Sequence, residues 1–253
     1  MIVANLATYP PRRERLTPVI AALAPQVDRL NVVLNEYDAI PEEVTGHANV
    51  VPVIPPYDLK DVGKFYPEVA ADDLVFLVDD DLNYPADYVA KTEARIAALG
   101  PGRFCAGYHS SLYVRPRRKP SRKTFEEWRQ FLFRPNTIAQ FRRVFWFREP
   151  MDAPKVVDQI ATNTCIIRGA DLPSFAYMES SQRFVDVRLA KWCFEHGITP
   201  VALPRERDWL TAVTFEETIF RDFTKTDPAH VAKEIRSYAF RVPGRGGAPG
   251  QAA

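Results

Sequence analysis

The chain has 253 residues, of which 46% are hydrophobic and 26% charged, and this balance is typical of a globular protein with a core of ordinary size. A net charge of +1 argues against a partner recognised through overall charge, no apolar run approaches the ~20 residues of a membrane span, and residues 1–5 lack the pattern of a signal peptide. The three cysteines, Cys105, Cys165 and Cys193, are far apart and form no paired motif, so we expect buried thiols in a reducing cytoplasm.

The first third of the chain predicts alternating strands and helices. Residues 2–7 form an apolar run typical of a strand, which Pro10-Pro11 ends. A helix with one core-facing side is predicted from four apolar residues at helical spacing: Leu16, Val19, Ile20 and Leu23. Residues 30–34 and 50–54 predict two further strands, and Pro52 places the second of them at a sheet edge.

The most informative stretch is an apolar run that leads into three carboxylates. Residues 74–78 have the composition of a strand buried on both faces of a parallel sheet. Asp79, Asp80 and Asp81 follow at its carboxyl end, which is where ligands bind in open α/β sheets. Three adjacent negative charges repel one another, so we favour a hard divalent cation shared with a phosphorylated ligand. The alternative is a solvated acidic turn.

The remainder of the chain continues the alternation. A helix is predicted from residues 84–87 to about Leu99. Further strands are predicted at 103–108, 163–168 and 198–203, and further helices at 184–194 and 227–238. The helix at 184–194 has Gly197 as its carboxyl cap, and its core face carries Val185, Leu189, Trp192 and Cys193. These elements predict one α/β domain over residues 1–240, with a mostly parallel central sheet flanked by helices, and a disordered tail over 241–253.

One segment differs from the rest in composition. Between Arg115 and Arg148 there are eleven lysines or arginines, two acids and eight large aromatic residues. Phe125, Trp128, Phe131 and Leu132 keep helical spacing, so residues 115–150 predict an insertion with at least one amphipathic helix. The favoured interpretation packs the aromatics on the core and solvates the arginines. Contact of 115–148 with an anionic membrane or with a lipid-linked substrate comes next, and a nucleic-acid surface comes last.

Short blocks at the predicted strand ends carry a family resemblance. They comprise residues 7–12, 34–38, 61–65, 78–85, 107–109, 186–190, 197–198, 204–205 and 209–210. Through them, residues 1–210 resemble bacterial family 2-like glycosyltransferases of the GT-A fold, of the kind found in surface-polysaccharide gene clusters. Val78-Asp79-Asp80-Asp81 stands at the position of the family's DxD signature. This chain departs from its relatives at Ala161-Thr162-Asn163-Thr164, where they carry Gly-Thr-Gly-Thr on the acceptor side.

The resemblance implies that a sugar moves from a nucleotide-diphosphate donor, expected to be a UDP-sugar, to a glycan or lipid-linked acceptor. It places the 115–150 insertion on the acceptor side, and the protein in the cytoplasm or at the inner face of the membrane. Mn²⁺ or Mg²⁺ held by Asp81 and Asp79 would stabilise the departing diphosphate. Alternatively, Asp79 bonds the ribose and Asp80 approaches the sugar.

The donor would be bound by loops that follow the first three strands. The candidates are Thr8, Tyr9, Arg12, Asp38, Asp61 and Lys64. Arg12 and Lys64 can also bind phosphate. Gly63 stands between Asp61 and Lys64, and we expect it to let the backbone approach the ligand.

Inverting transfer needs a general base that takes the proton of the acceptor hydroxyl. Asp186 occupies the position where relatives place a carboxylate for this purpose, and Glu179 is the second candidate. His109, at the ligand edge of the sheet, is a candidate contact to acceptor or metal, and His230 is a weaker metal candidate.

Two other functions stay open. A sugar-phosphate nucleotidyltransferase would need a glycine-rich phosphate loop after the first strand, where this chain has Thr8-Tyr9-Pro10-Pro11. A catalytically silent nucleotide-sugar-binding module would keep the fold without turnover.

Overall fold

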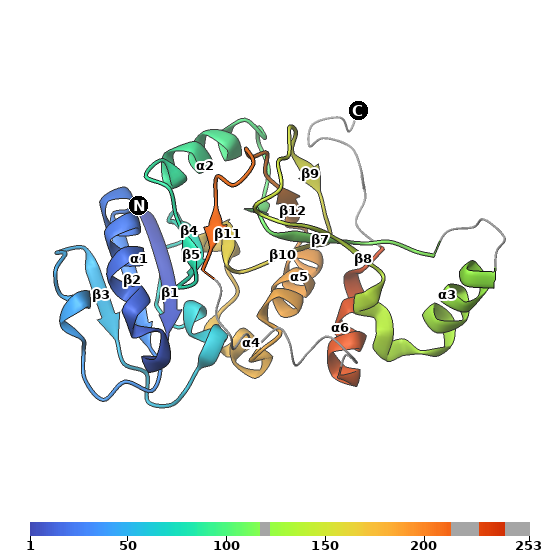
Figure 1. Ribbon diagram of the computed structural model, residues 1–253, viewed down its shortest axis with the longest axis horizontal. Coiled ribbons are helices and arrows are strands. Elements are labelled where there is room, and N and C mark those ends of the chain that lie inside the picture. Colours follow the sequence, from blue (N-terminus) through green and yellow to red (C-terminus); the bar gives the residue numbers. More distant parts are fainter. Residues whose placement is uncertain (117–121, 214–227, 241–253) are drawn as a thin grey trace.

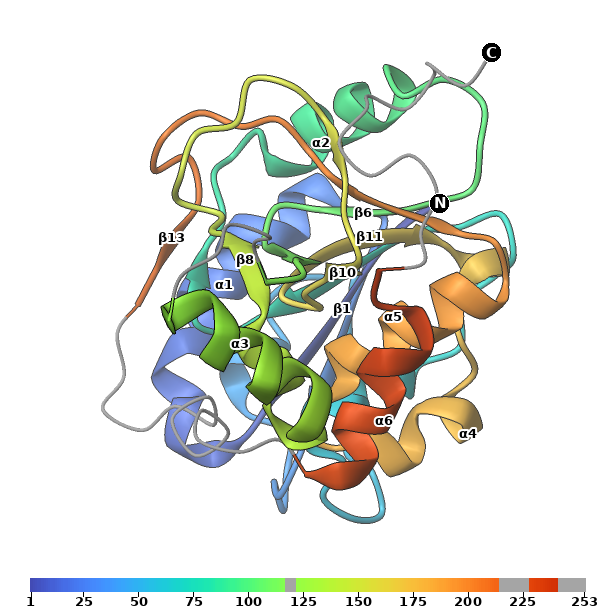
Figure 2. The same cartoon turned by 90° about the vertical axis from the view of Figure 1, so that its right-hand side faces the viewer.

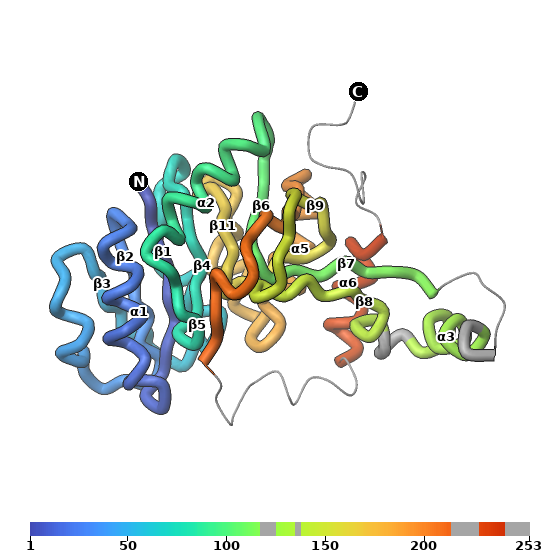
Figure 3. The backbone as a smooth tube through the Cα atoms, turned by 45° about the horizontal axis from the view of Figure 1, so that its top comes forward, coloured from blue at the N-terminus to red at the C-terminus, as the bar shows by residue number. Residues whose placement is uncertain are grey.

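The chain folds around an eight-stranded central sheet, as seen in a computed structural model that describes residues 1–116, 122–213 and 228–240 (Figure 1). Its strands are β1 (Ile2–Thr8), β2 (Arg29–Leu34), β3 (Val50–Val53), β4 (Leu74–Asp79), β6 (Phe104–Gly107), β9 (Lys155–Val156), β11 (Thr164–Arg168) and β12 (Thr199–Ala202). They lie in the order β3-β2-β1-β4-β11-β6-β12-β9, of which Figure 3 shows the part from β3 to β6. Only β11 and β9 run against the others, so the predicted mostly parallel sheet is confirmed.

Helices cover both faces of this sheet (Figure 2). Their bounds are α1 (Leu16–Leu23), α2 (Tyr88–Ala97), α3 (Arg122–Phe133), α4 (Phe175–Met178), α5 (Val185–Glu195) and α6 (Ala229–Tyr238). The alternating side chains of β4 explain the two layers. Phe76 and Val78 pack with α1 and α2, whereas Val75 and Leu77 pack with α4 and α5.

Several predicted features of the helices and strands are confirmed. All four helical-spacing residues of α1 are buried, and β3, which contains Pro52, is an edge strand. Gly197 follows α5 with φ +66°, a left-handed conformation that glycine adopts without strain. The predicted start of α2 at residue 84 is four residues too early, because Tyr84 folds back and its hydroxyl bonds the backbone of Asp79.

The region after β6 differs more from expectation. The strand predicted at 103–108 is β6, and residues 110–113, where no strand was predicted, form a separate strand, β7 (Ser110–Tyr113). This strand forms a second sheet with β8 (Arg142–Phe145) and β10 (Gln159–Ile160). A third small sheet pairs β5 (Leu82–Asn83) with β13 (Thr211–Ala212).

The predicted amphipathic helix of the insertion is α3. The aromatic residues of the insertion are buried only in part. Phe145 and Phe147, which lie outside α3, are buried, whereas Phe125 and Phe133 of α3 are 73% and 77% exposed. The interpretation that the insertion buries its aromatics on the core is therefore wrong for α3. The predicted tail, 241–253, and the predicted start of the last helix at Asp227 lie outside the described residues. Among the described helices, none is both long enough and apolar enough to cross a membrane.

Candidate functional site

The acidic turn lies where the winding of the sheet reverses. From β1 the chain proceeds to β2 and β3 on one side, whereas β4 lies on the other side of β1. β1 and β4 are parallel and Ala7 pairs with Asp79, so both strands end at the same edge. Ligands of open α/β sheets bind at such a switch point, because the loops diverge there and leave a crevice.

Asp80 ties the acidic turn to the loop after β1. Its side chain is almost fully buried, accepts a 2.7 Å hydrogen bond from the Oγ1 of Thr8 and pairs with the guanidinium of Arg12. Arg12 belongs to the 3₁₀ helix η1 (Pro10–Arg15), and it lies 5.6 Å from the ring of Tyr9. Burial raises the pKa of Asp80, and the charge of Arg12 offsets part of that rise. The carboxylate of Asp80 thus faces the protein.

Lys64 contacts the neighbouring carboxylate from the opposite side. It lies in the 3₁₀ helix η4 (Lys60–Phe65) and is 3% exposed. Its ammonium group pairs with Asp79 and donates to the backbone oxygen and the Oγ1 of Thr162, at 3.3 and 3.2 Å. Burial lowers the pKa of Lys64, but the charge and hydrogen bond of Asp79 together with the charges of Asp186 and Asp61 outweigh the effect of burial, so the net pKa is raised. This buried cation is directed at Asp79 and Thr162.

Buried asparagines hold η4 over the ends of the strands. The side-chain amide of Asn31 donates to Asn5 at 2.7 Å, and the amide of Asn5 donates to the backbone oxygen of Lys64 at 2.8 Å. Asn35 accepts from the backbone of Leu59 at 3.1 Å. These residues were not among the sequence candidates, although a buried strand that carries an asparagine is the pattern that could have identified them.

Gly63 lies where η4 packs on the sheet. A Cβ at this position would lie 3.1 Å from Val33 and 3.2 Å from Ala7. The glycine therefore lets η4 approach the sheet, and the expectation that it also lets the backbone approach a ligand stays a prediction.

Asp186 and Asp61 complete the group around Lys64. Asp186, in the first turn of α5, accepts a 2.8 Å hydrogen bond from the backbone N–H of Thr162. Asp61 accepts one of 2.8 Å from the N–H of Arg183. Burial raises the pKa of Asp186, and it raises that of Asp61 to about 6. Thr162 links Lys64 to Asp186. The sequence singled it out only as part of residues 161–164, where this chain departs from the family that it resembles.

The other predicted residues lie apart from this group or at its margin. Asp38 and Glu179 are exposed, and Glu179 pairs with the hydroxyl of Tyr57. His109 is half-buried; its ring lies 5.9 Å from that of Trp146, and burial lowers its pKa to about 4, so it is neutral at pH 7. His230 is exposed and lies against the ring of Phe184.

The site carries an excess of negative charge. Among the described residues, Arg12 contacts Asp80 and Asp81, and Lys64 contacts Asp79. The charge of Lys64 also acts on two further carboxylates, Asp61 and Asp186. Asp81 is 26% exposed, and its one side-chain hydrogen bond among the described residues is the 3.4 Å contact from Arg12. Burial, followed by the nearby charge of Asp79, raises its pKa to about 6. The charge of Arg12 lowers the pKa of Asp81 but does not offset burial and the neighbouring negative charge.

This donor set fits a hard cation that is shared with a ligand. Asp81 and the partly exposed Asp79 offer carboxylate oxygens of the kind Mg²⁺ and Mn²⁺ prefer. Over residues 1–116, 122–213 and 228–240, no three acidic, histidine or cysteine side chains are arranged to hold a metal by themselves. Mg²⁺ commonly needs only one or two protein carboxylates when phosphates of a substrate supply further oxygens.

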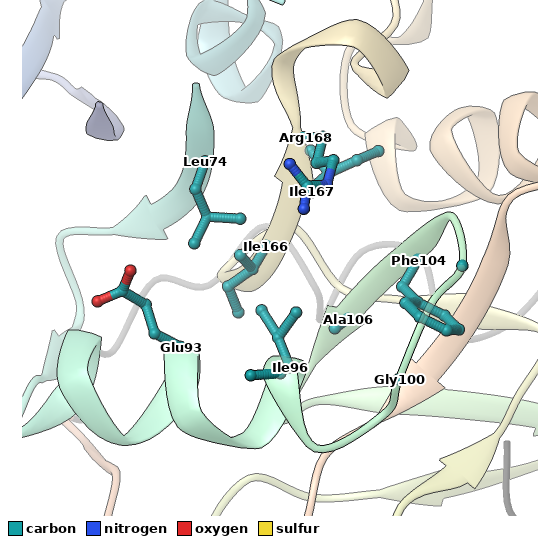
Figure 4. A pocket seen from close by; sticks show the side chains of 11 residues that line it. Leu74, Glu93, Ile96, Gly100, Phe104, Ala106, Ile166, Ile167 and Arg168 are labelled. Atoms are coloured by element: carbon teal, nitrogen blue, oxygen red, sulfur yellow. The ribbon is translucent and has the colours of Figure 1, made fainter. Parts of the chain in front are cut away.

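The cavity drawn in Figure 4 lies elsewhere. It has a volume of about 320 Å³, and Leu74, Ile96 and Ile166 converge on it between α2 and the strands. Leu74 begins β4, whereas the carboxylates follow its end. The cavity is therefore at the opposite end of the sheet from the site.

Comparison with known proteins gives little beyond this geometry. No family model and no curated protein matches the chain. A crystal structure of a mycobacterial protein is similar at 18% sequence identity and a TM-score of 0.43, over 82% of this chain and 68% of that chain. The functional assignment therefore rests on the site.

Proposed function

We propose that this chain is a metal-dependent glycosyltransferase of the GT-A type, which moves a sugar from a nucleotide-diphosphate donor to a glycan or lipid-linked acceptor in the cytoplasm. The observation that carries the proposal is the position of Asp81 at the switch point between β1 and β4. Its carboxylate is partly exposed, and the charge of Arg12 offsets its negative charge only in part. The mostly parallel sheet and the family resemblance of residues 1–210 support it. The free, buried cysteines fit a reducing compartment.

The donor's diphosphate would lie beside Asp81 and Asp79. A Mn²⁺ or Mg²⁺ ion held by these two residues would neutralise charge on the departing diphosphate. Lys64 fixes Asp79 in place, and Arg12 with Thr8 fixes Asp80, so the turn keeps its shape when the donor binds. Asp80 thus acts as a support for the site in this proposal, rather than as a group that approaches the sugar.

Asp186 is the carboxylate best placed for the proton transfer. The acceptor hydroxyl gives its proton to Asp186 while its oxygen bonds the anomeric carbon, and the bond from that carbon to the diphosphate oxygen breaks with both electrons on the diphosphate. Burial raises the pKa of Asp186, which makes its carboxylate a stronger base. Glu179 is exposed and paired with Tyr57, so it is the weaker candidate.

A thermal-shift panel tests the proposal. UDP-, GDP-, CDP- and dTDP-sugars are added with and without Mn²⁺ to the wild type, to Asp81→Asn and to a control, Asp72→Asn, at an exposed acid before β4. Ligand at a hundred times its Kd stabilises a protein by about 2.7 kcal/mol, which for this length raises Tm by about 5–10 °C. We expect such a shift for one nucleotide with Mn²⁺, its loss in Asp81→Asn and its retention in the control. Failure of every nucleotide to shift the wild type, or equal shifts in Asp81→Asn, would overturn the proposal. Binding without consumption of any donor would identify a silent binding module.

A further inference from the structure

Helix α3 presents an apolar and basic surface to solvent. This surface, the α3 face, consists of Phe125, Arg129, Leu132 and Phe133. The three apolar residues are 73%, 61% and 77% exposed. The spacing of i, i+4, i+7 and i+8 places the four residues on one side of the helix. Large apolar side chains gathered in this way mark an interaction surface more often than isolated ones do.

The helix is held in place from its other side. The ring of Phe131 packs edge-on against Phe141 and Phe240, with centroids 5.3 and 5.6 Å apart. Arg236 of α6 also donates to the backbone oxygen of Phe131 at 3.4 Å. The exposure of the α3 face is therefore a property of the fold. Figures 1 and 3 place α3 at the end of the molecule remote from β3, where it projects beyond the central sheet.

Charge indicates what covers this surface. Residues 115–148 contain eleven lysines or arginines and two acids, whereas the whole chain has a net charge of +1. One of the two acids, Glu126, is paired with Arg129 at 2.7 Å. A second copy of the chain in a symmetric contact would place this basic segment against itself. A surface that is both apolar and anionic is complementary to it, as at the headgroup region of an acidic bilayer.

We propose that the α3 face docks on anionic lipid bilayers as an interfacial helix, with Phe125, Leu132 and Phe133 among the acyl chains and the surrounding arginines at the phosphates. This proposal is independent of the glycosyltransferase assignment, since it concerns a surface remote from the carboxylates.

Vesicle co-sedimentation of the full chain tests the proposal. The lipid samples are phosphatidylcholine vesicles with and without phosphatidylglycerol. Two variants alter the α3 face and its flank, Phe125→Ser with Phe133→Ser and Arg129→Gln with Arg134→Gln. Two matched controls alter exposed residues elsewhere, Val51→Ser on β3 and Arg168→Gln at the end of β11. Thermal melting of each variant checks that it is folded, which we expect because the substituted side chains are exposed.

We expect the wild type to sediment with the phosphatidylglycerol vesicles and to remain in solution with the neutral ones. Binding should weaken about fivefold for each arginine removed, because one arginine near an anionic surface contributes about 1 kcal/mol of attraction, which is about fivefold in affinity. Binding should be lost in the serine variant. Salt at about 1 M, which reduces the electrostatic screening length to ~3 Å, should weaken vesicle binding as well. Equal binding by the serine variant and the wild type, or no binding by the wild type, would overturn the proposal. A dimer in sedimentation velocity that the serine substitutions abolish would show that a second copy covers this face instead.

Discussion

The ammonium group of Lys64 lies against the carboxylate of Asp79, although the two residues come from different elements, η4 and β4. Lys64 is almost fully buried, and it also donates to Thr162, whose backbone N–H donates to Asp186. One buried cation thus joins the turn after β4 to the start of α5. The position of Asp79 depends directly on this side chain, and Thr162 links the same side chain to Asp186.

Replacing Lys64 with methionine, which keeps the length of the side chain, should destabilise the fold. The substitution leaves Asp79 and Asp186 facing one another without the cation between them, and breaking a buried pair in this way costs about 3–5 kcal/mol. Asp79 is 30% exposed, so we expect a loss of stability at or below the lower end of this range, about 2–3 kcal/mol. Urea unfolding measures it. Lys91→Met, which removes an exposed ammonium paired with Asp87 at 2.9 Å, is the control and should leave the midpoint unchanged. Equal midpoints for the two variants would contradict the role given to Lys64.

The stability of the metal-free protein should respond to pH through Asp81. The pKa of this carboxyl is about 6 in the folded chain, against an ordinary value of 3.8 that applies when the chain is unfolded. Between these values the folded state binds more protons, so the contribution of Asp81 to stability falls as pH rises from about 4 to about 6. Asp81→Asn does not lose stability in this way, because its amide does not ionise. We expect the variant to gain on the order of 1–2 kcal/mol relative to the wild type across that window. Urea unfolding at a series of pH values gives the difference, and a difference that does not change with pH would refute the assignment.

Asp186→Asn should separate donor binding from transfer. The amide oxygen can still accept the hydrogen bond from Thr162, so the site should keep its shape and its nucleotide-dependent thermal shift. Loss of the base should lower the transfer rate by about 10²–10⁴-fold. Glu179→Gln, at an exposed carboxylate, is the matched comparison and should transfer sugar at close to the wild-type rate. Should Asp186→Asn transfer normally while Glu179→Gln does not, the two roles are reversed.

The three cysteines should be unreactive in the folded protein. Cys105, Cys165 and Cys193 are free and buried, and the sulfurs of the first two lie 3.5 Å apart. Because a thiol reagent needs access to the sulfur, Ellman's reagent should titrate none of them in the native state and all three in denaturant. Release of one equivalent without denaturant would show that at least one of the thiols is accessible.

Local pattern was sufficient to predict the longer helices and strands around the site, but not the 3₁₀ helix η4, which carries Lys64. The spacing of apolar residues identified α1 and α5, the unbroken apolar run identified β4, and Pro52 identified β3 as an edge strand. The position of Asp79–Asp81 at the ligand edge followed as well, because the carboxyl end of a parallel strand is fixed by the direction of the chain. Each of these inferences needs only neighbours within a few residues.

The tertiary structure alone decided what each polar side chain contacts. Asp80 meets Thr8 across 72 residues, Lys64 meets Thr162 across 98, and Cys105 meets Cys165 across 60. These contacts depend on which strands are neighbours and in what register, and loops of any composition can connect them. The same limit applies to α3. Periodicity predicted its amphipathic helix, but whether the aromatics are covered depends on where the rest of the chain packs, and Phe125 and Phe133 are left in solvent. Sequence thus determined most of the elements and the location of the acidic turn. The fold determined that Asp79 and Asp80 pair closely with Lys64 and Arg12, whereas Asp81 has only a 3.4 Å contact from Arg12 among the described residues.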